Sequence, residues 1–316
     1  MKAEEIKNPL FVPFDKLIER SMVELDATDP TECLSTSFDW LDDKIVGLFK
    51  GELLVVGGET GTGKTAFVTN ICYKAAQRGN KVDVFALEDR LADYGIKAVY
   101  FELGRVRKKK GFPHNYPWKE YRKNEIQDPN YKSLRQEAEL KIKNSNLSFA
   151  EIYGQMNIDI LEAMITQRVA EGTKLFLIDH LHYFDMTRSN VSRAEYVEHL
   201  MIRIKSLQNK TGARIILVVH YKKLEGKKPM LDSFKDSISI PQNANYVVNM
   251  WRDRSEKGNR YETFFYLPKA RNPSGEATIK VTYDPDENEY KNPFEEFGTP
   301  QKDDVKEIAN RINLDD

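Results

Sequence analysis

The chain has 316 residues, enough to bury a full hydrophobic core in one large or two small domains. Hydrophobic residues make up 40% and charged residues 31%, and no apolar stretch approaches the length of a membrane span, which argues against a membrane partner. Forty-eight Lys and Arg balance 49 Asp and Glu, for a formal net charge of -1, so any anionic polymer would need a local basic patch.

The cysteines Cys33 and Cys72 show no Cys-x-x-Cys or Cys/His spacing, which argues against a disulfide scaffold and a zinc site. The N-terminus has no apolar leader segment. We therefore expect a cytoplasmic protein. Residues 1–33 form an arm that is too short for a domain, with one or two amphipathic helical turns around Phe14, Leu17 and Ile18.

An apolar run at residues 53–57 predicts a buried strand, and a phosphate-binding loop (P-loop) of the pattern G-x-x-x-x-G-K-[ST] follows it directly. Its glycines let backbone N–H groups turn toward a polyphosphate, and the helix that starts near Lys64 points its positive end there. Lys64 would neutralise the β- and γ-phosphates, and the Thr65 hydroxyl would hold Mg²⁺. The alternative is a glycine-rich turn without a ligand. The predicted nucleotide-binding residues are Gly58, Glu59, Thr60, Gly61, Thr62, Gly63, Lys64, Thr65 and Ala66.

Further buried strands are predicted at residues 82–87, 174–178 and 214–219, with helical patterns between them. This alternation predicts an α/β fold with a mostly parallel, twisted sheet flanked by helices. The three strands end at Glu88, Asp179 and His220. Because ligands bind at the carboxyl ends of strands in open α/β sheets, we expect these side chains to gather around one nucleotide.

Each strand-end residue has a catalytic and a structural interpretation. Asp179 could hold the hydrated Mg²⁺, or it could cap the next turn. Glu88 could accept a proton from the water that attacks the γ-phosphate, or it could be a solvated carboxylate at the start of a helix. His220 could contact the γ-phosphate and act as a sensor of its loss, or it could be a structural histidine.

The loop after His220 carries Lys222, Lys223, Lys227 and Lys228, which could neutralise the phosphates of a single strand or could form a solvated basic loop. Residues 90–150 are charge-rich and mostly helical in pattern. More strands are expected at 246–251, 262–268 and 277–283, and residues 292–316 form an acidic, polar tail.

The ordered set of motifs resembles the motor of DnaB-type replicative helicases over about residues 34 to 290. The motifs that carry the resemblance are residues 37–42, 58–65, 85–88, 178–180, 219–220, 233–237 and 269–275. The pair Asp179-His180 and the sensor His220 are more similar to the phage and mitochondrial branch than to the bacterial one. The resemblance implies a RecA-like P-loop NTPase core, a ring of six subunits that uses ATP and Mg²⁺ at subunit interfaces, and 5′-to-3′ translocation on single-stranded DNA (ssDNA).

Several roles come from this resemblance alone. Lys269 and Arg271 match a basic pair in which the arginine reaches the neighbouring subunit's site as an arginine finger. Arg252 and Tyr283 match residues that pack the nucleotide base. Lys222 and Lys235 match DNA-contacting positions of the family. The chain departs from the family pattern at residues 235–238, where Lys-Asp-Ser-Ile lacks the usual glycine and adds an acid.

The expected organisation is an N-terminal arm at 1–33, the RecA-like ATPase domain at 34–291 and a C-terminal tail at 292–316. An arm of this length has no room for the helical or primase domain of relatives, so we expect separate primase, polymerase or loader proteins in a bacterial or phage-infected cell. Two other functions use the same core. One is a recombinase-like filament on ssDNA with ATP as a switch, and the other is an ATP-dependent loader or adaptor that clamps a partner protein.

Overall fold

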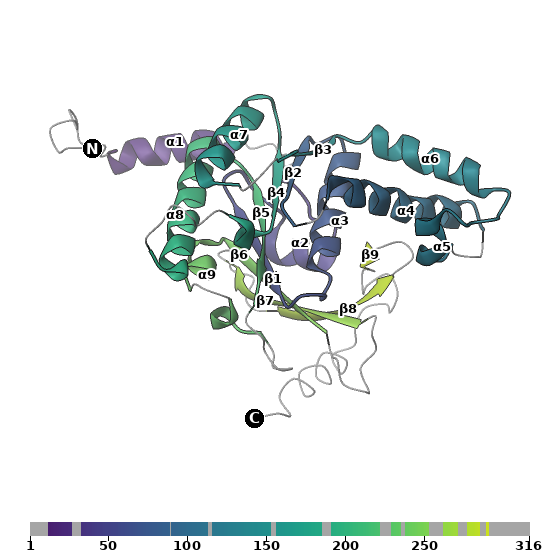
Figure 1. The fold of residues 1–316 in the computed structure, drawn as a ribbon. Coiled ribbons are helices and arrows are strands. Elements are labelled where there is room, and N and C mark those ends of the chain that lie inside the picture. The colour runs from purple at the N-terminus through teal and green to yellow at the C-terminus, as the bar shows by residue number, and fades with distance from the viewer. Residues whose placement is uncertain are drawn as a thin grey trace, which may run out of the picture.

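The structure is a computed structural model of the chain, and a central β-sheet with helices on both faces dominates it (Figure 1). It describes residues 12–26, 33–88, 90–112, 116–152, 156–184, 191–221, 229–234, 238–252, 262–270, 277–284 and 289–290. Among the helices in these ranges, none combines the length and the apolar character needed to cross a bilayer.

The described strands form one 9-stranded sheet in the order β3-β2-β4-β5-β1-β6-β7-β8-β9. All neighbours from β3 to β6 pair in parallel, whereas β7, β8 and β9 are added antiparallel at one side. The bounds are β1 Leu53–Gly58, β2 Val82–Ala86, β3 Leu147–Phe149, β4 Leu175–Asp179, β5 Ile215–His220, β6 Tyr246–Trp251, β7 Glu262–Ala270, β8 Ala277–Asp284 and β9 Glu289–Tyr290. The expected mostly parallel sheet is confirmed.

The central strand β1 is buried along its whole length between β5 and β6. A strand buried on both faces needs a continuous apolar run, which residues 53–56 supply. Its last residue, Gly58, pairs with His220 of β5 on one side and with Met250 of β6 on the other. On the far side of β5, Ala86 of β2 pairs with Asp179 of β4. The register therefore brings the carboxyl ends of these strands to one edge of the sheet.

Helices cover both faces of the sheet, and the pleat of β1 divides the core between them. Leu54 and Val56 belong to a cluster with α2 and α3, whereas Leu53 and Val55 belong to a cluster with α7, α8 and α9. These helices span α2 Asp39–Ile45, α3 Lys64–Gln77, α7 Ile158–Ala170, α8 Arg193–Thr211 and α9 Ser239–Asn243. Figure 1 shows α7 and α8 on the face away from α2 and α3.

The longest helices in this layer begin and end at recognisable residues. The α8 helix starts with a capping box, in which Ser192 and Glu195 each satisfy a free backbone N–H of the other. The α7 helix starts at Asn157, whose side chain accepts a hydrogen bond from Ile160 N. These local sequences explain why the helices return the chain to the sheet where they do.

A helical unit beside the sheet has its own small core. It consists of α4 Leu91–Lys109, α5 Trp118–Lys123 and α6 Tyr131–Lys143, and it projects to the right in Figure 1. Its core is rich in tyrosines that pack at ring distances of 4.9 to 6.5 Å. The helical prediction for this segment is confirmed. The short strand β3 at its end was not predicted, because its three residues stand in a charge-rich segment without an apolar run.

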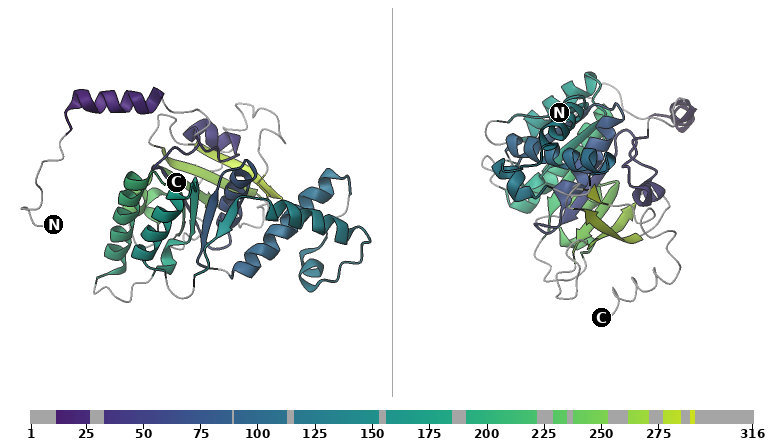
Figure 2. Two further views of the ribbon diagram at one scale, coloured as in Figure 1. Left: turned by 90° about the horizontal axis from the view of Figure 1, so that it is seen from above. Right: turned by 90° about the vertical axis from the view of Figure 1, so that its right-hand side faces the viewer.

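The amphipathic turns expected in the N-terminal arm form a longer helix, α1 Phe14–Asp26, of 13 residues. Figure 2 shows α1 lying apart from the sheet in both views. Phe14, Val23 and Leu25 are exposed by 74%, 69% and 62%. An apolar helix face of this kind is typical of a surface that packs against another molecule.

Candidate functional site

The P-loop connects the carboxyl end of β1 to α3, whose first residue is Lys64. Gly63 precedes the helix with a φ of 94°, a left-handed conformation that side chains rarely adopt. Gly58 needs to be glycine for another reason, since a Cβ there would lie 2.8 Å from Met250 O and from Thr62 Oγ1. The loop therefore places backbone N–H groups and the positive end of α3 at the sheet edge where an anion would bind.

The ammonium group of Lys64 lies inside this loop. Its Nζ donates to Glu59 O at 2.9 Å and lies 3.3 Å from His220 Nδ1. Burial lowers the pKa of Lys64 to about 8, and the carboxylates of Asp179, Glu88 and Glu59 oppose that shift. The Lys64 charge is only partly compensated by the protein, as expected of a cation that waits for a phosphate.

The carboxyl group of Asp179 is buried at the end of β4. Burial raises its pKa to about 6, against the effect of a hydrogen bond from Thr65, and the neighbouring Glu88 raises it further. Tyr94 donates to Oδ2 at 3.4 Å, whereas Oδ1 is buried and has no hydrogen-bond partner among the described residues. A buried carboxylate oxygen without a partner is a natural ligand for a cation or its water shell.

Mg²⁺ prefers oxygen ligands, and Thr65 and Asp179 offer them next to the P-loop. A second group, Glu88 with His180 and His220, has one ligand atom from each residue within 4.8 Å of the others. Two imidazole nitrogens fit Mg²⁺ poorly. The residues at this edge therefore fit a Mg²⁺ ion at Thr65 and Asp179.

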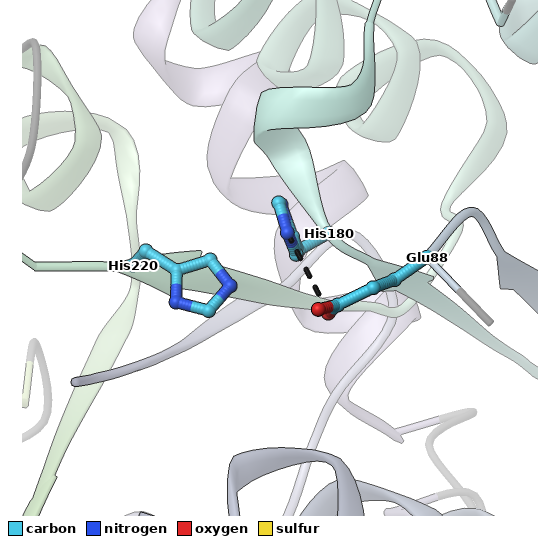
Figure 3. A group of neighbouring side chains, drawn as sticks. All are labelled: Glu88, His180 and His220. Atoms are coloured by element: carbon cyan, nitrogen blue, oxygen red, sulfur yellow. Dashed lines mark ion pairs between the residues drawn. The ribbon is translucent and has the colours of Figure 1, made fainter. Parts of the chain in front are cut away.

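The three side chains of the second group come from the ends of β2, β4 and β5 and point toward one another (Figure 3). Glu88 is 40% exposed, and its Oε2 lies 3.6 Å from Nε2 of the buried His180. The His180 and His220 rings meet edge to face at 4.2 Å. Burial lowers the pKa of His180 to about 3, with help from His220 and His182, so the imidazole is neutral. The cluster joins a solvent-accessible carboxylate to the histidine beside Lys64.

The structure brings Arg252 and Tyr283 together, with the guanidinium 5.5 Å from the ring centroid. A third residue, Tyr290, was not predicted from the sequence. It is buried under the P-loop, and its hydroxyl lies 3.2 Å from Gly63 O and 3.4 Å from Thr62 O, to which it donates. Burial raises the pKa of Tyr290, so the hydroxyl keeps its proton.

Lys269 lies away from this cluster. Its Nζ donates to Pro241 O and Gln242 O, at 2.5 and 3.1 Å, at the end of α9. This contact lies within the chain, whereas the resemblance to helicases led us to expect Lys269 in a neighbouring subunit's site. The remaining predicted residues lie outside the described part of the chain, namely Arg271, Lys222, Lys223, Lys227, Lys228 and Lys235.

Two residues that complete the site, His180 and Tyr290, were missed as site residues. His180 directly follows Asp179, so its place at a strand end was a usable signal. Tyr290 carries no such signal, because it stands 228 residues from Thr62 in a short strand and contacts the P-loop only in the folded chain.

Comparisons with known proteins agree with the motif order. The profile of the DnaB-like helicase C-terminal domain matches residues 33–292. The replicative DNA helicase DnaC of Bacillus subtilis (strain 168) is 23% identical over 310 residues, which cover 94% of this chain and 64% of that protein. The replicative DNA helicase DnaB of Mycoplasma genitalium is 25% identical over 270 residues, covering 79% and 55%. The chain thus spans less than two thirds of the length of these two relatives.

Solved structures show the same fold. The ATPase domain of a phage DnaB-like helicase superposes with a TM-score of 0.72 at 17% identity, covering 89% of this chain and 99% of that one. A DnaB-like replicative helicase, described together with its interactions with primase, gives 0.72 at 16% identity and covers 90% and 67%. The sheet is therefore that of RecA-like helicase ATPase domains. With the family profile matching most of its length, the chain belongs to the DnaB-like helicase C-terminal domain family.

Proposed function

We propose that this chain is an ATP-hydrolysing DNA helicase motor that moves 5′ to 3′ along ssDNA as a ring, with ATP bound between subunits. The observation that carries the proposal is the meeting of Lys64, Asp179 and His220 at one sheet edge, around the mouth of the P-loop. The motor would span residues 34–291, between the arm and the tail.

In this proposal the P-loop binds the triphosphate. Backbone N–H groups at the start of α3 meet the β-phosphate, and Lys64 leaves Glu59 O to meet the γ-phosphate. Thr65 and Asp179 would hold Mg²⁺, which neutralises the charge that develops on the phosphate oxygens when it is bound. The raised pKa of Asp179 means that its carboxyl is ready to bind the cation only above about pH 6.

Glu88 is the candidate general base. It stands at the same edge, and its 40% exposure lets water reach the carboxylate. His220 is the candidate sensor, because it touches the lysine that would release it on binding the γ-phosphate. Loss of that phosphate would return Lys64 to His220, at the start of the lysine-rich loop proposed to contact DNA.

The register of β7 supports a finger that acts between subunits. Ala270, the last residue of β7, pairs with Tyr246 at the amino end of β6, whereas the P-loop lies at the carboxyl end of β1. The chain therefore leaves β7, just before Arg271, at the edge opposite its own nucleotide site. A cation supplied there serves a neighbour in a head-to-tail ring and leaves the subunit's own site incomplete.

The proposal also covers partners. The apolar face of α1 fits a role in packing against a neighbouring subunit. Because the solved relative was studied with primase, we propose that a separate primase, polymerase or loader works with this motor.

The test is unwinding of a forked DNA duplex by the purified chain with ATP and Mg²⁺. We expect unwinding that requires a 5′ single-stranded tail and stops in Lys64→Met. Hydrolysis stimulated by ssDNA without unwinding would point to a recombinase-like filament, and ATP-dependent binding of a protein without either activity would point to a loader. Negative-stain images with ssDNA and a non-hydrolysable nucleotide separate a ring from a filament.

A further inference from the structure

The hydrogen bond made by one ring nitrogen of His180 determines where its proton lies. The backbone N–H of His182 donates to His180 Nδ1 at 3.1 Å, in the short helix η3 Leu181–Tyr183. A nitrogen that accepts a hydrogen bond carries no proton, and a neutral imidazole has one N–H. His180 is therefore the tautomer with its proton on Nε2.

This Nε2–H faces the candidate base. It lies 3.6 Å from Glu88 Oε2, about half an ångström beyond hydrogen-bond length. Figure 3 shows the two groups directed at each other, with His220 on the other side of the imidazole. Hydrogen bonds in nucleotide-free sites are often long and shorten when substrate binds.

The two partners differ in freedom. The His180 ring is buried and packs against His220 at 4.2 Å and against Tyr183 at 4.7 Å, so its orientation is held by its neighbours. Glu88 is 40% exposed at the end of its strand, and a carboxylate in such a position can adopt several rotamers. A fixed donor beside a free acceptor can select one of them.

We propose that His180 is a positioning residue that donates its Nε2–H to one oxygen of Glu88 and directs the other oxygen at the attacking water. The inference rests on the proposed hydrolysis of ATP. In that step Glu88 takes a proton from water, the water oxygen bonds to the γ-phosphorus, and the bond from that phosphorus to the ADP oxygen breaks. The His180 proton stays on Nε2 throughout, so the products are ADP, phosphate and a protonated Glu88 that later returns its proton to solvent.

The test compares two substitutions of His180. H180F keeps a flat ring but has no donor, and we expect its kcat for ATP to fall about tenfold to a hundredfold, as for a reacting group displaced by about 1 Å. Its KM and its affinity for a fluorescent ATP analogue stay within about threefold, because the phosphate contacts are unchanged. H180Q restores an N–H donor at a similar reach and recovers most of the rate. His199→Phe, an exposed histidine on α8, serves as the matched control.

A double-variant cycle with E88Q separates positioning from a structural role. If His180 acts through Glu88, H180F lowers the already slow rate of E88Q by less than about twofold. An equal loss in both backgrounds, or a kcat of H180F like that of wild type, overturns the inference. If H180F does not fold, H180A is measured with and without imidazole, and failure of imidazole to raise its rate has the same meaning. A wild-type protein without ATPase activity removes the proposed function and the inference together, whereas an active wild type with an inert E88Q removes only the inference when H180F is unaffected.

Discussion

Asp83 and Asp179 are buried on the neighbouring strands β2 and β4, and their surroundings treat a negative charge in opposite ways. Asp83 accepts hydrogen bonds from Arg168 at 2.7 and 2.8 Å and from Thr173 at 2.8 Å. Asp179 has one buried oxygen without a partner in the described residues, and its pKa rises to about 6. The charge of Asp83 is compensated within the chain, and that of Asp179 is kept for a cation.

This contrast predicts opposite effects of Asp179→Asn and Asp83→Asn on the nucleotide-free protein. The folded pKa of Asp179 exceeds its ordinary value of 3.8, so the folded state binds more protons between pH 4 and 6 and wild-type stability falls as pH rises through that window. Asp179→Asn should therefore raise the free energy of unfolding at pH 7 by about 2 kcal/mol. Asp83→Asn should lower it by about 3 kcal/mol, because Arg168 loses its partner.

Urea unfolding at pH 7 and pH 4.5 measures both effects. The gain in Asp179→Asn should shrink at the lower pH, where the wild-type carboxyl is protonated, and the same protein should lose Mg²⁺-dependent ATP turnover. A gain of equal size at both pH values would mean that packing and not charge explains it.

At the scale of elements, the P-loop depends on a strand from the far end of the chain. Tyr290 of β9 lies beneath the loop, next to Arg252 and Tyr283, and a Cβ at Gly63 would collide with its hydroxyl. The hydroxyl holds the carbonyls of Thr62 and Gly63 on the side of the loop away from the phosphate site, which leaves the N–H groups to face the ligand.

We predict that Tyr290→Phe weakens ATP binding about three- to tenfold and costs about 1 kcal/mol of stability, the value of one hydrogen bond. The ring is kept, so the aromatic packing against Phe67 and Phe265 remains. Tyr283→Phe is the matched control, since it keeps the ring that faces Arg252. Isothermal titration with a non-hydrolysable ATP analogue measures the change, and equal affinities for Tyr290→Phe and wild type would contradict it.

The strands that could be predicted are those whose burial leaves a mark in the local sequence. β1, β4 and β5 are continuous apolar runs that end in a glycine or a polar residue, and the strand ends gather as the sheet rule requires. β3 and β9 could not be predicted, because strands of three and two residues have no periodicity to detect. The contact of Tyr290 and the tautomer of His180 depend on neighbours that only the folded chain supplies.

At the scale of the whole molecule, the sheet separates two parts of one reaction. The P-loop opens at the carboxyl edge of β1, and the chain leaves β7 toward Arg271 at the amino edge. A hydrolysis site that needs both must draw them from two copies of the chain. Hydrolysis would then report assembly, because an isolated subunit cannot complete its own site.

Mixing two inactive variants tests this arrangement. Glu88→Ala and Arg271→Ala should each lack ATP turnover, yet an equal mixture should recover up to about a quarter of wild-type turnover, the share of random interfaces in a closed ring that combine both intact residues. The measurement is ssDNA-stimulated ATPase activity after the variants are mixed in denaturant and refolded together. Activity of the mixture that stays at the sum of the two variants would assign both residues to one subunit.

The contact between Tyr290 and the P-loop joins residues 228 positions apart. During synthesis at about 5 to 20 residues per second, the ribosome releases the P-loop many seconds before the tyrosine that holds it in shape. A nascent or prematurely terminated chain has its Walker motif but lacks the part that shapes it. Competence to retain nucleotide is thus acquired at the end of translation, which keeps unfinished chains from entering rings as nucleotide-loaded subunits.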